Sequence, residues 1–499
     1  MAKIVKCQTL AGQAIEYVDE IIGSGAMKDV YFSPDKSYVV ALYKARPDSQ
    51  ARERLKSITT TYWDRLFNEP GGDYWKNLFC WPEGIIERNG LIGIVAPAYP
   101  KHFFFEHGSR NNDILAIKGK EKEGKWFAAA NLRNRFMDRR ELGDWLNHLR
   151  MCVLLARAVK KMHMMGLAHS DLSYKNVLVD PTQGHACVID IDGLVVPGKY
   201  PPDVVGTPDF IAPEVVMTSH LSRDDRGRKL PRRETDQHAL AALIYMYLLY
   251  RHPLRGGKVH DVDDEQRDEA LGMGEKALFI EHPSDMSNRI RVEDARPTEL
   301  PWADTSQIPY TITGPYLSPL FLQAFVGGLH DPGLRPSAND WETALVKTVD
   351  LVQPCQNSAC PQKWYVFDNS IKPRCPFCGT LHKGKLPVLN LYSSRKEGNF
   401  RPDNHRLMVW TGQSLFLWHV NSRIAPNEKL TSDQKKRVGY FVFHHDAWWL
   451  VNERLPDLID VSTKTPIPIG GRMELTDGLQ FLLAKGDGGR LVVVQMVEG

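Results

Sequence analysis

The sequence predicts an α+β fold divided into several domains, because strand-like and helix-like segments alternate and their proportions change along the chain. Residues 17–44 read as strands joined by turns, and a stretch of helical periodicity follows at 49–67. Strongly apolar helices are expected at 142–165 and 236–250, whereas the last 110 residues contain short strand-like runs separated by turn residues. At 499 residues the chain is too long for one core, so we expect about two to four domains.

Composition excludes several classes of protein. The chain is 42% hydrophobic and 25% charged, which is typical of a globular protein, and its formal net charge is only +3. A charge this small gives no reason to expect nucleic acid or an anionic membrane as a partner. No apolar run approaches the roughly 18 residues of a membrane span. The first seven residues lack the apolar stretch of a signal peptide, so we expect a cytoplasmic protein with reduced thiols.

The most informative segment is a short loop with the pattern H-x-D-x-x-x-x-N, in which His169, Asp171 and Asn176 are the fixed positions. An apolar run follows at once, and a second one, 187–189, ends in Asp190. Phosphoryl transfer needs a base near the accepting hydroxyl and oxygen ligands for Mg²⁺. Asp171, Asn176 and Asp190 supply these groups in the order that a protein kinase uses.

Two features near the N-terminus fit the same chemistry. Gly23, Ser24 and Gly25 form a turn between strand-like runs and are followed by Val30. Glycine lacks a Cβ, so backbone N–H groups in such a turn can approach a phosphate. Lys44 ends the next strand-like run and is a candidate for binding the α- and β-phosphates.

The order of these motifs resembles that of the protein kinases, and the resemblance covers residues 15–350. The segment 206–214, Gly-Thr-Pro-Asp-Phe-Ile-Ala-Pro-Glu, is similar to the end of a kinase activation segment. Asp236 resembles the acid that anchors the catalytic loop, and Arg335 resembles the arginine that pairs with Glu214. The resemblance implies a two-lobed protein-kinase-like fold with ATP and Mg²⁺ as cofactors.

The sequence departs from the kinase pattern at several positions. Ser170 replaces the arginine before the catalytic aspartate, and Ser173 replaces the catalytic-loop lysine, for which Lys175 is a possible substitute. Asp192 competes with Asp190 as the magnesium ligand. Lys44 lies one residue later than the usual lysine, and two acids are available to pair with it from the following helix, Glu53 and Asp64.

Within the kinases, H-S-D-L-S-Y-K-N and I-D-I-D-G-L, together with a cysteine-rich tail, resemble bacterial Ser/Thr kinases of the tellurium-resistance-associated TerY-phosphorylation triad. That resemblance implies a von Willebrand A-like protein and a PP2C-like phosphatase as partners.

Four of the eight cysteines lie within 24 residues, as Cys355-x4-Cys360 and Cys375-x2-Cys378. Two such pairs on two turns resemble a zinc ribbon, in which four thiolates bind a structural Zn²⁺. Two disulfides are the alternative, and a redox C-x-x-C motif is less consistent with the surrounding sequence, which shows no βαβ pattern.

We therefore expect four domains: a kinase N-lobe (1–100), a kinase C-lobe (101–350), a zinc ribbon (351–386) and a β-sandwich (387–499) that resembles a forkhead-associated domain. The expected function is ATP-dependent phosphorylation of Ser/Thr hydroxyls in proteins. The alternatives are a nucleotide-binding pseudokinase scaffold and a small-molecule kinase, and the segment 206–214 argues against the latter.

Overall fold

The computed structural model describes residues 3–196, 198–200, 206–367, 372–396 and 398–498. The chain separates into two compact units. The first unit comprises residues 1–143, 147–310 and 319–342, and the second comprises 144–146, 311–318 and 343–499. Within the described ranges, no helix is both long enough and apolar enough to cross a membrane.

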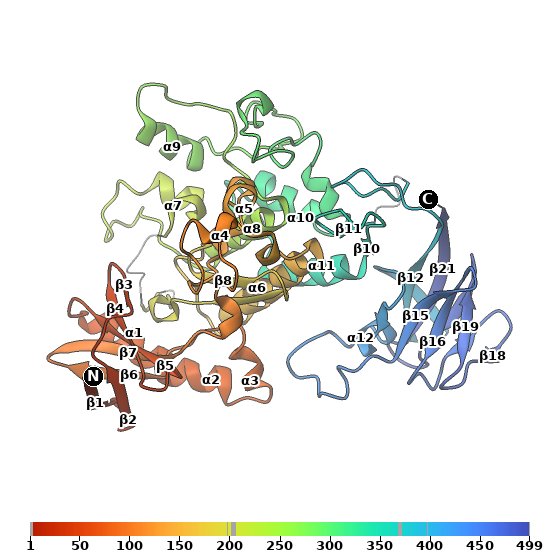
Figure 1. The fold of residues 1–499 in the computed structure, drawn as a ribbon, viewed down its shortest axis with the longest axis horizontal. Helices are drawn as coiled ribbons and strands as arrows, with labels where there is room; N and C mark the ends of the chain where they lie inside the picture. Colours follow the sequence, from red (N-terminus) through yellow and green to blue (C-terminus); the bar gives the residue numbers. More distant parts are fainter. Residues whose placement is uncertain (1–2, 197, 201–205, 368–371, 397, 499) are drawn as a thin grey trace. The chain divides into compact units, whose positions relative to one another are not determined.

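The first unit begins with a five-stranded antiparallel sheet in the order β3-β4-β5-β7-β6, which is drawn in red and orange in Figure 1. Its strands are β3 (Gly23–Ser24), β4 (Lys28–Phe32), β5 (Tyr38–Tyr43), β6 (Gly84–Arg88) and β7 (Leu91–Pro97). A separate hairpin of β1 (Ile4–Gln8) and β2 (Ala14–Val18) precedes it.

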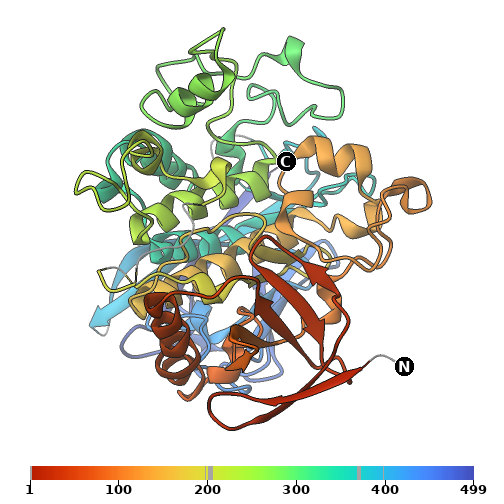
Figure 2. The ribbon, with the colours of Figure 1, turned by 90° about the vertical axis from the view of Figure 1, so that its left-hand side faces the viewer.

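The two faces of this sheet are covered by different elements, as alternation along the strands requires. Val40 and Leu42 of β5 pack with Tyr17 of the β1–β2 hairpin on one face. On the other face Ala41 packs with Leu55 of the helix that follows β5. Figure 2 shows this helix beside the red strands.

The helix at 49–67 confirms the periodicity of that stretch. It consists of α1 (Ser49–Ser57), a π-helical turn (Ile58–Tyr62) and α2 (Trp63–Phe67). The side chain of Asp48 accepts a hydrogen bond from Ala51 N at 2.7 Å, which satisfies one of the unpaired N–H groups at the start of α1.

The rest of the first unit is mainly helical and surrounds α8 (Arg233–Leu249), whose residues from Ala239 to Leu249 are all buried. The expected helix at 142–165 is α6 (Trp145–Met164). The sequence pattern also predicts a helical stretch at 318–350, which in the structure is interrupted by a turn that contains Gly328 and Pro332. The other helices are α3 (Gly72–Trp75), α4 (Arg110–Asp113), α5 (Ala130–Phe136), α7 (Pro213–Met217), α9 (Glu265–Met273), α10 (Ser318–Leu322) and α11 (Ala338–Asp350).

A short hairpin carries the motif residues. Its strands are β8 (Val177–Asp180) and β9 (His185–Val188), and Val177 pairs with Val188. All four residues of β8 are buried. This is the strand, turn and strand expected after the H-x-D-x-x-x-x-N loop.

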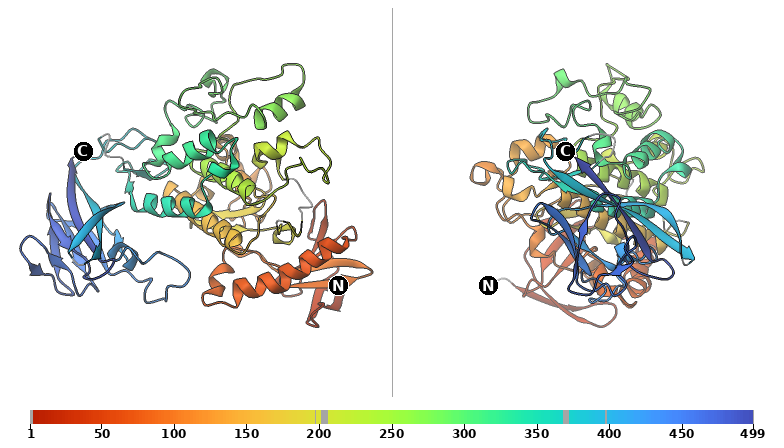
Figure 3. Two further views of the ribbon diagram at one scale, coloured as in Figure 1. Left: turned by 180° about the vertical axis from the view of Figure 1, so that it is seen from behind. Right: turned by 90° about the vertical axis from the view of Figure 1, so that its right-hand side faces the viewer.

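The second unit contains a cysteine-bearing hairpin and a β-sandwich. The hairpin pairs β10 (Val352–Pro354) with β11 (Trp364–Val366). The sandwich has a six-stranded sheet, β13-β12-β21-β20-β17-β18, and a four-stranded sheet, β14-β15-β16-β19. Both sheets contribute to one apolar core, and Figure 3 shows the blue strands from two sides.

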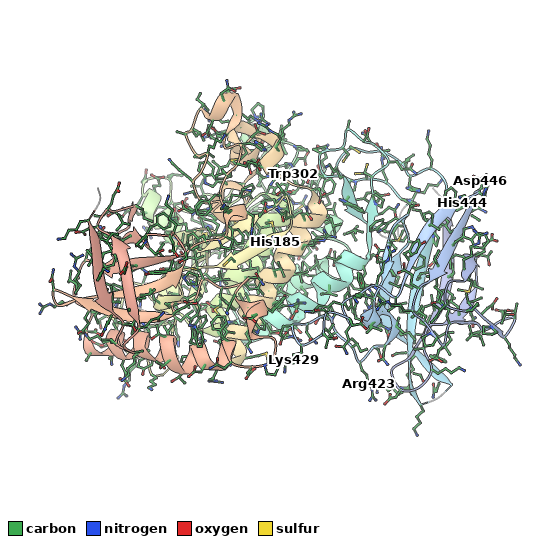
Figure 4. All side chains as sticks on the ribbon, turned by 60° about the horizontal axis from the view of Figure 1, so that its bottom comes forward. His185, Trp302, Arg423, Lys429, His444 and Asp446 are labelled. Carbon is green, nitrogen blue, oxygen red and sulfur yellow. The ribbon has the colours of Figure 1, made fainter. Side chains whose placement is uncertain are left out.

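The sequence predicts five strand-like runs in this domain, at 406–410, 415–418, 440–443, 448–451 and 490–494, and strands overlap all of them except most of 415–418. The strands are β12 (Lys385–Lys396), β13 (Asn399–Met408), β14 (Ser414–Leu415), β15 (Gly439–His444), β16 (Ala447–Asn452), β17 (Ile459–Asp460), β18 (Thr465–Pro466), β19 (Arg472–Leu475), β20 (Gln480–Leu482) and β21 (Arg490–Glu498). The expected strand at 415–418 was wrong beyond Leu415, because α12 (Leu417–Val420) replaces it. The β15–β16 turn, at Asp446 in Figure 4, has positive φ at its two central residues, as tight hairpins prefer.

Candidate active site

The loop 169–176 is held by a hydrogen bond to the first turn of α8. Asp236, in the first turn of that helix, accepts a hydrogen bond from His169 N at 2.8 Å, and its side chain is buried. The Nε2–H of His169 donates to the backbone oxygen of Ile189 at 2.9 Å. The loop is therefore tied both to the helix and to the segment that leads into Asp190, as the sequence predicted for Asp236.

Hydrogen bonds to both carboxylate oxygens of Asp171 fix the orientation of its side chain. Its Oδ1 accepts from Thr207 N at 2.6 Å, and its Oδ2 accepts from the amide of Asn176 at 3.0 Å. The amide of Asn176 also donates to the backbone oxygen of Asp171 at 2.8 Å. The side chain of Asp171 is only partly buried, so it remains accessible.

The β8–β9 ladder brings Asn176 to Asp190. Ile189 N donates to the backbone oxygen of Asn176 at 3.0 Å, which extends the hairpin by one pair beyond Val177 and Val188. Asn176 and Asp190 consequently lie at the same end of the hairpin. Three oxygen-bearing side chains predicted from the sequence are thus on adjacent segments.

Asp190 and Asp192 differ in backbone and in burial. Asp190 has φ of +59°, a left-handed conformation that costs about 1–3 kcal/mol in a residue other than glycine and recurs at functional sites. Its side chain is 47% exposed, whereas that of Asp192 is 5% exposed. Burial acts to raise the pKa of Asp192, but the ammonium group of Lys28 outweighs it and holds the pKa below its ordinary value.

Lys28 is a residue of this site that the sequence analysis missed. Its Nζ donates to Asp190 Oδ1 at 2.9 Å and to Asp192 Oδ2 at 2.7 Å. The hydroxyl of Tyr43 also donates to Asp192. Burial acts to lower the pKa of Lys28, but the two carboxylates raise it above its ordinary value.

A signal for Lys28 was present in the sequence. The glycine-loop pattern G-x-G-x-x-G-x-V, placed on Gly23, Gly25 and Val30, puts Lys28 where the third glycine is expected. A lysine that is mostly buried at that position needs an acidic partner, and the carboxylates of Asp190 and Asp192 both pair with it.

The structure places Lys44 elsewhere. Its Nζ donates to Ser24 Oγ at 2.9 Å and to the backbone oxygen of Gly25 at 2.7 Å, and it pairs with Asp29 at 3.3 Å. These contacts join it to the glycine turn, in which Gly25 N bonds to the backbone oxygen of Lys28. The structure therefore does not bring Lys44 to the two aspartates.

The two acids that were considered as partners for Lys44 also point elsewhere. Glu53 and Asp64 are both exposed, and Asp64 accepts from the side chain of Asn68 at 2.9 Å. Two residues of α1 are buried, Arg54 and Leu55. Arg54 is 4% exposed; burial raises the pKa of Tyr43, and the positive charge of Arg54 acts to lower it.

The departures in the loop have distinct surroundings. Ser173 is fully buried, and its Oγ accepts from the Thr207 hydroxyl at 3.2 Å. Lys175 is exposed, and its backbone N donates to Ser173 Oγ at 3.3 Å. Ser170 has φ of +66° and contributes a hydroxyl where an arginine was expected.

The segment 206–214 is held by two charged contacts. Arg335 binds Glu214 with two hydrogen bonds of 2.9 and 2.7 Å, the pair predicted from the sequence. Asp209 accepts from Tyr174 of the catalytic loop at 3.0 Å and from Arg255 at 2.7 Å. Both contacts fix the segment against the helical part of the first unit.

We expect Arg335→Met to destabilise the first unit by about 3–5 kcal/mol, because removing one partner leaves the other charge unpaired in a buried site. The guanidinium of Arg335 also donates to the backbone oxygens of Gly328, Leu329 and Glu234, which would lose their partner. Thermal unfolding of the full chain measures the effect. The control is Arg140→Met, which breaks an exposed pair with Asp138 and should change little. Equal shifts for both variants would contradict the prediction.

The four clustered cysteines meet in the second unit. Their sulfur atoms all lie within 4.8 Å of one another, with Cys355–Cys378 at 3.5 Å and Cys360–Cys375 at 3.8 Å. A tetrahedral Zn²⁺ site with bonds of about 2.3 Å has sulfurs about 3.8 Å apart. All four are free thiols in this structure rather than the disulfides considered as an alternative. The donor set therefore fits zinc.

One thiol of this cluster is already acidic. Burial acts to raise the pKa of Cys378, but hydrogen bonds involving Thr380 and the neighbouring cysteines lower it to about 6. A lowered pKa favours the thiolate, which is the form that binds metal.

Comparison with known proteins agrees with the geometry of the first unit. Residues 123–293 match the family described as "Protein kinase domain". Citron rho-interacting kinase of Rattus norvegicus is 33% identical over 148 residues, which cover 28% of this chain and 6% of that protein. Citron Rho-interacting kinase of Homo sapiens is 30% identical over 179 residues, which cover 34% of this chain and 8% of that protein.

A third relative is death-associated protein kinase dapk-1 of Caenorhabditis elegans, which is 33% identical over 103 residues, or 20% of this chain and 6% of that protein. The matched part of the chain thus spans less than a tenth of the length of each of these relatives. The match includes the loop of Asp171, the hairpin that leads to Asp190, and the segment that ends in Glu214. Residues 123–293 of this chain are therefore similar to the protein kinase domain family.

Proposed function

We propose that the chain is an ATP- and Mg²⁺-dependent kinase that phosphorylates Ser or Thr hydroxyls of proteins in the cytoplasm. The observation that carries this proposal is the position of Asp171. Its carboxylate is held between Asn176 and Thr207 and remains accessible from solvent. A carboxylate fixed in this way can orient an acceptor hydroxyl and take its proton.

Asn176 and Asp190 are the residues that would hold Mg²⁺, which neutralises charge on the transferred phosphoryl group when bound. Gly23, Ser24 and Gly25 would cover the nucleotide phosphates, and Val30 would pack beneath the nucleotide. Thr207 and the segment that follows it would support the acceptor peptide, because Asp209 and Glu214 tie that segment to the rest of the domain.

A bacterial stress or tellurite-resistance role, with a von Willebrand A-like protein and a PP2C-like phosphatase as partners, is the finer part of the proposal. It is supported by H-S-D-L-S-Y-K-N, by I-D-I-D-G-L and by the four cysteines. The β-sandwich stays a prediction of a forkhead-associated-like domain, for which we propose partner docking. We propose that the four cysteines bind one structural Zn²⁺.

A pseudokinase scaffold is the second candidate, and specific observations favour it. Ser173 stands where a catalytic lysine is expected, and Lys28 pairs with both aspartates that are candidates for binding metal. A scaffold of this kind would bind nucleotide and partners without turnover.

Incubation with γ-labelled ATP, Mg²⁺ and a generic protein acceptor separates the two candidates. The proposal expects label on the acceptor or on the chain itself, and phosphoamino-acid analysis should identify phosphoserine or phosphothreonine. Nucleotide binding without any incorporation would support the scaffold instead.

We expect Asp190→Ala to reduce Mg²⁺-dependent transfer more than Asp192→Ala. Asp190 follows the strand residue that pairs with Asn176, and its side chain is exposed to an incoming ion, whereas Asp192 is enclosed by Lys28 and Tyr43. Titrating both variants with Mg²⁺ measures the difference. The reverse order would assign the ion to Asp192.

A further inference from the structure

Lys28 and Tyr43 form a cross-strand pair in the sheet. They are directly opposite each other on the antiparallel strands β4 and β5, and Lys28 Nζ lies 5.5 Å from the centre of the Tyr43 ring. Opposite residues on an antiparallel pair project to the same face. Both side chains reach the carboxylate of Asp192 from that face.

The hydrophobic contacts of these strands show that Lys28 and Tyr43 project from the face of the sheet that packs against α1. Ala41 and Val30 pack with Leu55 of α1, and Tyr43 packs against the same cluster. Side chains two apart on a strand share a face, so Tyr43 follows Ala41, and Lys28 follows Val30.

Lys44 directly follows β5, which ends at Tyr43. Its backbone N–H donates to the backbone oxygen of Met27, so the antiparallel pairing continues by one residue and the alternation of side chains turns Lys44 away from the aspartates. Its ammonium group contacts Ser24, Gly25 and Asp29, and its side chain is 40% exposed, compared with 20% for Lys28. Kinases use a lysine on the strand corresponding to β5 to bind the α- and β-phosphates. In this chain Tyr43 stands at the inward position of that strand.

We infer that Lys28, projecting from β4, is the lysine that binds the nucleotide phosphates in this protein, and that Tyr43 replaces the usual lysine of β5. The inference rests on the proposed function of this site. Lys28 is the ammonium group that the described structure brings to Asp190 and Asp192, where phosphate and metal meet in a kinase. Tyr43 holds Asp192 with its hydroxyl and lies under the stem of Lys28.

The presence of Tyr43 on β5 is also consistent with the fact that α1 has a buried arginine, Arg54, rather than a buried acid. A lysine on β5 needs an acid from that helix, and the kinase pair is lysine with glutamate. Here the buried charged residue of the helix is Arg54; burial raises the pKa of Tyr43, and the charge of Arg54 acts to lower it. A phenol at position 43 carries no charge, so it does not require a glutamate on this helix.

Binding measurements on the full chain test the inference. Calorimetry with ADP, with ATP and with adenosine compares the wild type, Lys28→Met and Lys44→Met. Loss of a hydrogen-bonded charged contact weakens binding by about ten- to a hundredfold, so Lys28→Met should lose this much affinity for ADP and ATP. Its affinity for adenosine, which has no phosphate, should stay within about twofold. Lys44→Met should lose less affinity for ADP than Lys28→Met does.

A second variant keeps the test valid if Lys28→Met perturbs the sheet. Since positions 28 and 43 are direct cross-strand partners, Lys28→Met/Tyr43→Lys restores an ammonium group on the same face. We expect this double variant to bind ADP more tightly than Lys28→Met, with Tyr43→Lys alone as the matched control. Melting temperatures show whether each variant is folded.

Three results would overturn the inference. They are a larger loss of ADP affinity in Lys44→Met than in Lys28→Met, an equal loss of ADP and adenosine affinity in Lys28→Met, and no recovery in the double variant. Failure of the proposed function looks different. A wild-type protein that binds ADP but transfers no phosphate would exclude the kinase activity while leaving the role of Lys28 measurable, whereas a wild type that binds no nucleotide would exclude both.

Discussion

Replacing Asp171 with asparagine is expected to reduce phosphoryl transfer by about 10²- to 10⁴-fold, which is the contribution of a positioned acid–base group. Asparagine keeps the shape of the side chain and can still accept from Thr207 N, so the loop should stay folded. It cannot take a proton from the acceptor hydroxyl. The affinity for ATP should therefore remain within about twofold, since Asp171 contacts Asn176 and Thr207 rather than the glycine turn.

Initial rates with saturating ATP, together with ATP affinities from calorimetry, check this result. Asp35→Asn is a suitable control, because Asp35 lies in the β4–β5 turn and accepts hydrogen bonds from Ser33 and Ser37. Transfer by Asp171→Asn at the wild-type rate would show that Asp171 is not the base.

Removing zinc is expected to unfold the cysteine-bearing part of the second unit. Binding at a structural site of four thiolates is worth about 10–16 kcal/mol at neutral pH, and that free energy is coupled to local folding. Cys360 and Cys375 are almost fully buried, so each sulfur without a metal would sit close to other thiols in an apolar cluster with Tyr365. Cys360→Ser should therefore reduce both zinc content and local stability.

Elemental analysis of protein purified without chelators should find one Zn²⁺ per chain, and hydrogen exchange in residues 352–366 should rise on chelation. Cys7→Ser is the control, since Cys7 lies on β1 outside the cluster. Protein that contains no zinc and exchanges equally with and without chelator would contradict the prediction.

The catalytic loop could be predicted because its chemistry is local. Asp171 and Asn176 are five residues apart on one loop, and the hairpin that follows consists of two short apolar strands, so the position of Asp190 follows from strand pairing. The Glu214–Arg335 pair could be predicted only from resemblance, since 121 residues separate its members.

The phosphate lysine could not be predicted in the same way, because it depends on which face of a strand each residue occupies. Ala41 and Lys44 are three residues apart, so they project to opposite faces, whereas Tyr43, two residues from Ala41, shares its face. Recognising Lys28 also required the register that pairs it with Tyr43 across two strands. Registers arise from tertiary packing as much as from sequence pattern. The interruption of the sandwich strand after Leu415 by α12 has the same origin.

The most direct test of the account measures incorporation of labelled phosphate from γ-labelled ATP, with Mg²⁺ and a protein acceptor, by wild type and by Asp171→Asn side by side. The account predicts incorporation on Ser or Thr by the wild type that depends on Mg²⁺ and falls by at least about 10²-fold in the variant. Folded, zinc-loaded wild-type protein that binds ATP but gives no incorporation above the variant would contradict it.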